Sequence, residues 1–133
     1  MAIDYRNDAK LSAEDVAVLF DKSGIRRPTK DLERLQHMID NANLIITAWD
    51  ADTLVGIARA LTDFVWCCYL SDLAVDQEYQ HQGIGRELLR QVQQALMSEE
   101  VTLVLLSAPE AMAYYPNVGF EAVQSGWMIK RTK

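Results

Sequence analysis

The chain has few of the residues that mark metal centres and disulfide frameworks. Its 133 residues include only two cysteines, and these are neighbours, Cys67 and Cys68. Adjacent cysteines suit neither an ordinary disulfide nor the C-x-x-C spacing of a zinc site. The two histidines, His37 and His81, are far apart in the sequence. We therefore expect no metal site, and the reducing cytoplasm is the default location.

Long apolar runs and an excess of positive charge are lacking as well. The uninterrupted apolar stretches are short, such as 103–106, whereas a membrane span needs about 20 apolar residues. The first residues include Asp4, Arg6 and Asp8, and no apolar segment follows them, so we expect neither a signal peptide nor a membrane partner. Lys and Arg number 13 against 19 Asp and Glu, a net charge of −6. Because phosphate contacts need a basic footprint, we expect no nucleic-acid partner.

The residues that are present suffice for one hydrophobic core. Half of the chain is hydrophobic and 24% is charged, which is ordinary for a folded domain. A chain of this length buries roughly two thirds of its unfolded surface. Because we find no repeat, low-complexity tract or linker, we predict a single domain over residues 1–133.

Apolar periodicity and turn residues predict an alternation of helices and strands. Ser12 and Gly24 bound a first helix, and Pro28 and Thr29 open a second. We expect strands near residues 3–6, 44–49, 53–61, 66–75, 101–106, 118–123 and 126–130, and further helices near 84–98 and 110–115. The largely apolar run 101–106 indicates a strand buried on both faces. The order predicts an α/β (α+β) fold with a mixed, mostly antiparallel sheet.

The most informative segment joins the strand ending near Val75 to the helix beginning near Ile84. Gly83 and Gly85 lack Cβ atoms and allow positive φ, so backbone N–H groups can converge on one point. The helix that starts there has free N–H groups and a positive dipole end. Together these features predict a phosphate or pyrophosphate site, to which Arg86 adds a charged donor. The alternative is that two glycines merely make a tight turn.

Two known phosphate-binding motifs do not match this sequence. A dinucleotide loop, G-x-G-x-x-G, needs a glycine where the chain has Leu88. A P-loop needs a glycine at the same place and a lysine after it, and the chain has neither. The remaining pattern is Gln80-x-x-Gly83-x-Gly85.

In this pattern the chain resembles the GNAT superfamily of acyl-CoA-dependent N-acetyltransferases. A second match is the segment 115–120, Tyr-Pro-Asn-Val-Gly-Phe, which is similar to the family's Y-x-x-x-G-F. Both motifs stand in the family's order on the expected elements, and the element order agrees from residue 3 to 130. The resemblance implies a GNAT-like fold with helices on both faces of the sheet.

The resemblance implies acetyl-CoA as a co-substrate. The backbone of Leu73, Ala74 and Val75 would then pair with the pantetheine arm. The pyrophosphate would be bound by the loop residues Gln80, His81, Gln82, Gly83, Ile84, Gly85 and Arg86. His81 departs from the arginine or lysine often found in the family, which reduces the positive charge of the loop.

The resemblance also implies direct attack of an amine on the thioester in a ternary complex. Tyr115 is similar to the tyrosine that protonates the leaving thiolate, although an aromatic packing the last helix is the other interpretation. A base must take the amine proton, and we choose Asp72 because it lies within the strand beside the reaction. A carboxylate that satisfies a loop or β-bulge is an equal explanation for Asp72. Asp76 and Glu78 lie nearby.

The acceptor itself is not readable from the sequence. We predict a primary amine of a small molecule; a protein N-terminal or lysine acetyltransferase and a non-catalytic acyl-CoA-binding module are the alternatives. The acidic total favours a cationic amine slightly. Arg26 and Arg27 either hold an acidic group or are solvated, and we prefer the second. A homodimer is a further expectation, with the C-terminal strand near Trp127 as its edge.

Overall fold

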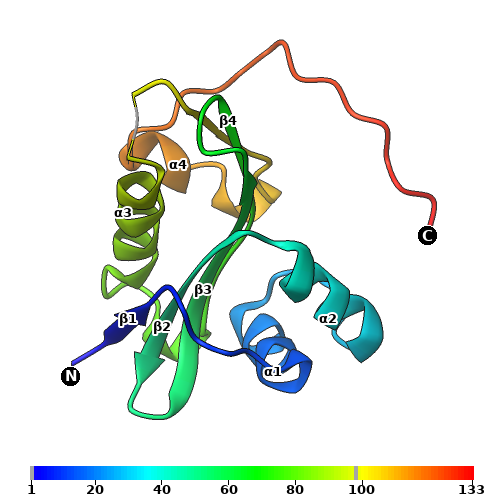
Figure 1. Ribbon diagram of the computed structural model, residues 1–133, viewed down its shortest axis with the longest axis vertical. Coiled ribbons are helices and arrows are strands. Elements are labelled where there is room, and N and C mark those ends of the chain that lie inside the picture. Colours follow the sequence, from blue (N-terminus) through cyan, green and yellow to red (C-terminus); the bar gives the residue numbers. More distant parts are fainter. Residues whose placement is uncertain (1, 98) are drawn as a thin grey trace.

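The computed structural model describes residues 2–97 and 99–133. Figure 1 shows its elements around one curved sheet. In chain order they are β1 (Asp4–Arg6), α1 (Ala13–Ser23), α2 (Leu32–Asn41), β2 (Leu44–Asp50), β3 (Thr53–Thr62), β4 (Cys67–Val75), a 3₁₀ turn (Gln77–Tyr79), α3 (Ile84–Leu96), β5 (Thr102–Leu105), a second 3₁₀ turn (Pro109–Ala111) and α4 (Tyr114–Asn117). The expected C-terminal end of α3, at Ser98, lies outside the described residues.

The sheet has the predicted mixed character. Its strands lie in the order β1-β2-β3-β4-β5. The first three pairings are antiparallel, and β4 pairs with β5 in parallel. Helices α1 and α2 cover one face and α3 covers the other (Figure 1). The predicted fold class is therefore confirmed.

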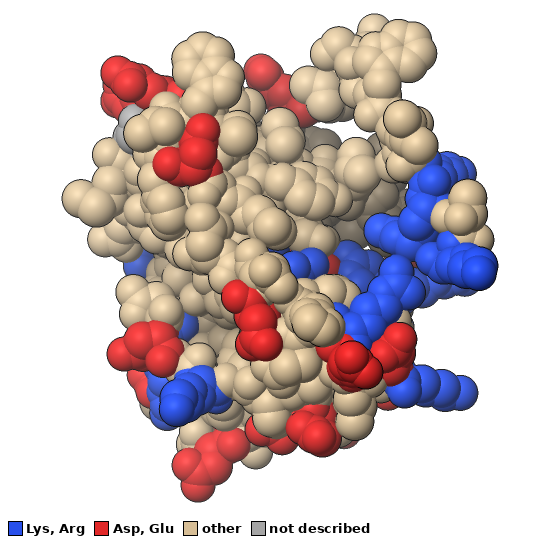
Figure 2. All heavy atoms as spheres, turned by 45° about the vertical axis from the view of Figure 1, so that its right-hand side comes forward, with Lys and Arg blue, Asp and Glu red and all other residues tan. Residues whose placement is uncertain are grey.

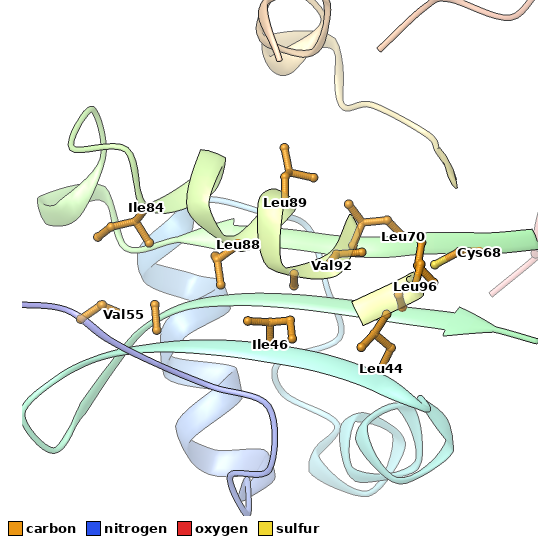
Figure 3. Close-up of a cluster of buried hydrophobic side chains, with 13 residues drawn as sticks. Leu44, Ile46, Val55, Cys68, Leu70, Ile84, Leu88, Leu89, Val92 and Leu96 are labelled. Carbon is orange, nitrogen blue, oxygen red and sulfur yellow. The ribbon is translucent and has the colours of Figure 1, made fainter. Parts of the chain in front are cut away.

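Each face of the sheet has its own hydrophobic core. On one face Ile84, Leu88 and Val92 of α3 point toward Ile46 and Val55 of the sheet (Figure 3). Complete burial of such side chains is worth about 1.5–3 kcal/mol each. These contacts fix the start of α3 against the middle of the sheet.

Gly56 lets α3 approach the sheet closely. A Cβ atom at this position would lie 3.2 Å from the side chains of both Ile84 and Leu88.

On the opposite face Phe20 of α1 is fully buried and packs in a cluster with Ile57. The sheet is therefore held from both sides.

The first helix has the predicted boundaries. The Ser12 hydroxyl accepts a hydrogen bond from the backbone N–H of Asp15 at 3.2 Å, and Gly24 ends the helix at φ 85°. The expected start of the second helix at Pro28 and Thr29 is wrong. The N–H of Thr29 bonds back to Arg27 and that of Asp31 to Pro28, so these residues form turns and α2 begins at Leu32.

The C-terminal part of the chain differs most from expectation. The predicted strands at 118–123 and 126–130 are not formed, and the chain after α4 runs as an irregular tail (Figure 1). Trp127 is 97% exposed there. Strand formation needs a partner edge as well as apolar residues, and the tail has no such pairing in the described part of the chain.

The expectation that β5 is buried on both faces is also wrong. Leu103 and Leu105 pack against the core beneath α3, whereas Val104 is 40% exposed. Among the described residues the strand is the last of the sheet and pairs with β4 alone. Successive side chains of a strand point to opposite faces, and at β5 the face away from α3 is left exposed at Val104.

Candidate active site

A cleft opens where β4 and β5 diverge. Their parallel pairing ends at Leu70 and Leu105, yet β4 continues to Val75 with β3 as its neighbour on the other side. In the β3–β4 register Arg59 faces Asp72 while the next residue faces Leu70, which leaves Ser71 as an extra residue. Such a β-bulge bends a strand and ends local pairing. One edge of β4 from Ser71 to Val75 therefore has no strand partner among the described residues, and the carbonyls of Ser71 and Val75 accept hydrogen bonds from the side chains of Arg27 and Gln80.

This cleft contains a cavity of about 710 Å³, which we call the cleft cavity. Its walls include Leu73, Ala74 and Val75 on β4, together with Gln80 and Tyr115. The structure thus brings together residues that the sequence placed in one site from three separate segments. Residues 105–111 supply much of the opposite wall.

The loop after β4 is fastened to the end of that strand. The Gln80 amide nitrogen donates to the Val75 carbonyl at 2.9 Å. The Asp76 carboxylate accepts from the backbone N–H of Glu78 at 2.9 Å, capping the 3₁₀ turn. His81 has a left-handed φ of 65°, which is uncommon for a residue other than glycine. The loop is exposed at His81 and Gln82.

The N-terminus of α3 has the geometry of an anion site. Gly83, at φ 85°, is the N-cap and supplies no side chain to the first turn. Within the described residues, the backbone N–H groups of Ile84, Gly85 and Arg86 have no hydrogen-bond acceptor. Free N–H groups at a helix N-terminus bind phosphate readily. These residues fit the pyrophosphate of a coenzyme A thioester.

The two tyrosines of α4 link this loop to the cleft. A Cβ atom on Gly85 would lie 3.1 Å from the Tyr114 hydroxyl, so the glycine allows α4 to pack against the start of α3. The rings of Tyr114 and Tyr115 meet edge to face with centroids 5.3 Å apart, and Tyr115 also meets Phe120 at 5.5 Å. Tyr115 is therefore held between two aromatic neighbours on the cavity wall.

The environment of Tyr115 keeps its hydroxyl protonated. Burial of the ring, and then the neighbouring Tyr114, raise the pKa of Tyr115 above its ordinary value of 10.0. Burial disfavours the charged phenolate because the protein interior solvates charge poorly. The hydroxyl is therefore a proton donor throughout the neutral range.

Asp72 lies in the bulged part of β4 but faces the layer beneath the cavity. Its side chain is 0% exposed. One carboxylate oxygen accepts from Arg27 at 2.5 Å, and the other accepts from Arg59. The Arg27 guanidinium also donates to the Ser71 carbonyl at 2.8 Å, and that of Arg59 donates to the Ser71 hydroxyl at 2.9 Å. The two arginines thus clamp the bulge.

Sequence reasoning allowed Asp72 as a carboxylate that satisfies a β-bulge, which the structure supports, but it missed the partners Arg27 and Arg59. Arg59 is a charged residue within an otherwise apolar stretch of β3 and is only 7% exposed. Because a buried charge requires a partner, that position was a usable signal. The preferred expectation that Arg27 is solvated is wrong, because its guanidinium pairs with the buried Asp72 carboxylate.

A second cavity, of about 880 Å³, adjoins the cleft cavity. The two share Arg26, Arg27, Ser71 and Leu106 as wall residues. Because six of its wall residues are Lys or Arg, we call it the basic cavity. Figure 2 shows Lys and Arg side chains gathered beside a hollow on this side of the molecule.

The parallel strands β4 and β5 splay apart where a glycine loop leads from β4 into the N-terminus of α3. The sequence profile of the acetyltransferase (GNAT) domain matches residues 9–128. The chain therefore belongs to the GNAT acetyltransferase family.

Curated relatives agree with this assignment. The chain is 27% identical to GCN5-related N-acetyltransferase 2, chloroplastic, of Arabidopsis thaliana over 92% of this chain and 55% of that protein. It is 26% identical to a probable acetyltransferase of Glycine max over 92% of this chain and 53% of that one. The chain thus spans about half the length of these relatives.

Solved structures show the same fold. A probable acetyltransferase from methicillin-resistant Staphylococcus aureus superposes with a TM-score of 0.83 at 24% identity, covering 98% of this chain and 100% of that one. An aminoglycoside N-acetyltransferase solved in complex with CoA gives 0.74 at 15% identity, over 99% of this chain and 96% of that one.

Two further findings concern membrane-spanning helices and metal ligands. None of the helices formed by residues 2–97 and 99–133 is long and apolar enough to cross a membrane. In the same residues, no group of three or more His, Cys, Asp or Glu side chains is arranged to hold a metal ion.

Proposed function

We propose that the chain transfers the acetyl group of acetyl-CoA to a primary amine of a small molecule. One observation carries this proposal: the edge of β4 without a strand partner and Tyr115 border one cleft, and Gln77 and Gln80, from the loop that leads to the free N–H groups of α3, line the same cleft. Strand-like backbone pairing suits the amide-containing pantetheine arm. The helix N-terminus suits the pyrophosphate.

The reaction proceeds by direct attack. The amine nitrogen bonds to the thioester carbonyl carbon, and the carbon–sulfur bond then breaks. Tyr115 donates its proton to the leaving thiolate and regains one from water, while the new amide nitrogen gives up its proton to solvent. Holding both substrates in one cleft lowers the entropic part of the barrier.

Asp72, which the sequence suggests as the base, has a different environment in the structure. Both of its oxygens already accept hydrogen bonds from guanidinium groups, and its side chain is 0% exposed. We propose that Asp72 is a positioning residue, which fixes Arg27, Arg59 and the bulge at Ser71. The amine then enters in its neutral form.

Thiol release from acetyl-CoA with a panel of amines tests the proposal. Removal of a general acid costs about 100-fold or more. We therefore expect Tyr115→Phe to lower kcat at least 100-fold with unchanged coenzyme affinity by calorimetry. Tyr114→Phe is the matched control, because it removes a hydroxyl from the neighbouring ring.

The other outcomes of this assay identify the alternatives. Tight CoA binding without thiol release for any amine, peptide or protein would identify a non-catalytic acyl-CoA-binding module. Release with lysine peptides or protein N-termini alone would identify a protein acetyltransferase. Equal activity of Tyr115→Phe and the wild type would exclude the proposed acid.

A homodimer and a cytoplasmic location remain proposals. The tail exposes Trp127 and Ile129 almost completely, and the outer edge of β5 lacks a strand partner among the described residues. Apolar side chains and open strand edges both favour association. Sedimentation of the wild type and Trp127→Ser would test the dimer: a dimer that the substitution dissociates is the expected result.

A further inference from the structure

We infer that the amine acceptor carries an anionic group, a carboxylate or a phosphate, which binds in the basic cavity. This inference rests on the proposed function and names the substrate class of the same site. Six of the wall residues of the cavity are cationic: Arg26, Arg27, Arg34, Arg59, Lys130 and Arg131. None of the described wall residues is Asp or Glu. The whole chain has a net charge of −6, so this local charge has the opposite sign.

Only part of this positive charge is neutralised within the protein. Arg27 and Arg59 share one carboxylate, that of Asp72, which lies behind the wall. The side chains of Arg26, Arg34, Lys130 and Arg131 have no ion pair among the described residues. Collecting unpaired cations around one cavity is electrostatically unfavourable unless an anion is bound there.

The cations come from four separate parts of the chain. Arg26 and Arg27 follow α1, Arg34 lies on α2 and Arg59 on β3. Lys130 and Arg131 belong to the C-terminal tail, which Figure 1 shows returning toward the side of the sheet that α1 and α2 cover. The tail therefore closes a basic wall that the sheet and helices begin.

The position of the cavity fits a bifunctional acceptor. It shares Arg26, Arg27 and Ser71 with the cleft cavity. An amine at the cleft end would place an anionic group on the same molecule among the cations. Guanidinium groups bind carboxylates and phosphates through paired, charge-assisted hydrogen bonds. An amino acid or a phosphorylated amine has this chemistry.

The first experiment compares matched acceptors. Ethanolamine is compared with phosphoethanolamine, and butylamine with 4-aminobutyrate, by thiol release at low salt. We expect the anionic member of at least one pair to have about tenfold higher kcat/KM, and the two pairs separate phosphate from carboxylate. The preference should shrink at high ionic strength, because salt screens charges at these distances. Equal or higher kcat/KM for both neutral members would overturn the inference.

The second experiment removes cations that touch only the basic cavity. Arg34→Gln combined with Lys130→Gln and Arg131→Gln should lower kcat/KM for the anionic acceptor about tenfold and leave coenzyme affinity unchanged. Lys10→Gln, a cation outside both cavity walls, is the matched control. An unchanged preference in the triple variant would contradict the inference.

A binding measurement separates this inference from the transferase proposal. Inorganic phosphate is titrated into the wild type, the triple variant and Lys10→Gln, with CoA present to fill the coenzyme site. Saturable binding that only the triple variant loses supports the basic cavity as an anion site, even if no amine is acetylated. Absent phosphate binding, or equal binding in all three proteins, would overturn it.

Discussion

The two cavities of the site are built in different ways. The cleft cavity and the loop beside it depend on backbone: the free edge of β4 and the N–H groups at the start of α3. These parts come from one continuous stretch, residues 71–86. The basic cavity depends on charged side chains from four segments, and two of these side chains, Arg27 and Arg59, are held in place by Asp72. Backbone recognition tolerates side-chain change, whereas a clamp made from one shared carboxylate does not.

The largest expected effect is on the clamp. Asp72→Asn keeps the side-chain shape but leaves Arg59, whose side chain is 8% exposed, and Arg27 without a negative partner. Breaking a buried ion pair costs about 3–5 kcal/mol. Urea unfolding should show this loss.

The exposed pair between Arg6 and Asp4 provides the control. Asp4→Asn should change the free energy of unfolding by less than about 1 kcal/mol, because exposed pairs contribute little. A comparably small loss for Asp72→Asn would show that the clamp is not what holds the bulge. Weakened coenzyme binding in folded Asp72→Asn would show that the clamp also shapes the edge of β4 that lines the cleft cavity.

The pH dependence of transfer should give the next largest effect. The neutral fraction of an alkylamine with a pKa of about 10 rises about 100-fold between pH 7 and 9, equivalent to about 2.7 kcal/mol. Because burial raises the pKa of Tyr115 above 10.0, the acid stays protonated over this range. We expect kcat/KM for the amine to rise without a descending limb below pH 10. A decline before pH 9 would contradict the assignment of Tyr115.

Backbone strain in the loop before α3 should weaken the binding of CoA. Gly83 has φ 85° and open space around a Cβ atom, so Gly83→Ala tests conformation without a clash. A left-handed alanine costs about 1 kcal/mol, which would weaken CoA binding about fivefold by calorimetry. Gly126→Ala has open space and no positive φ, and should be neutral. Equal affinities for both variants would show that the loop does not depend on this conformation.

The sequence predicts the geometry of the glycine loop and α3 better than that of the basic cavity, for a physical reason. Gly83, Gly85 and the apolar face of α3 act over short distances along the chain, so their spacing carries their geometry. Asp72 meets Arg27 and Arg59 only through the register of β3 with β4 and the bulge at Ser71. The sequence offered a β-bulge only as one explanation for Asp72, and it shows neither the register nor the two arginine partners.

The C-terminal segment shows a second limit. Its apolar residues predict strands at 118–123 and 126–130, because the strand propensity of a segment is judged from its own residues alone. A strand is stable only when another strand pairs with it, and the described chain gives this segment no such neighbour. Its cations then lie at the basic cavity instead, which no local pattern could indicate.

The smallest expected effect is the change in the free energy of unfolding when the charge of Glu87, in the first turn of α3, is removed. Hydrogen bonds from Arg90 and Gln91 lower the pKa of Glu87 to about 2. A lowered pKa means that the contribution of Glu87 to stability is present above its ordinary value of 4.5 and is lost as the pH falls toward 2. Arg90 is largely exposed and Glu87 partly so. Glu87→Gln should therefore reduce the free energy of unfolding at pH 7 by no more than about 0.5 kcal/mol.

A small effect of Glu87→Gln is what we expect if the start of α3 binds its ligand through backbone groups and not through side-chain charges. Urea unfolding at pH 7 and pH 2 should show a difference between Glu87→Gln and the wild type that disappears at the lower pH. Coenzyme affinity should stay within about twofold, since the first turn of α3 would bind pyrophosphate through backbone N–H groups. A loss above 1 kcal/mol, or a large change in affinity, would mean that side-chain charges also govern the coenzyme side. The contrast between backbone and side-chain recognition would then fail.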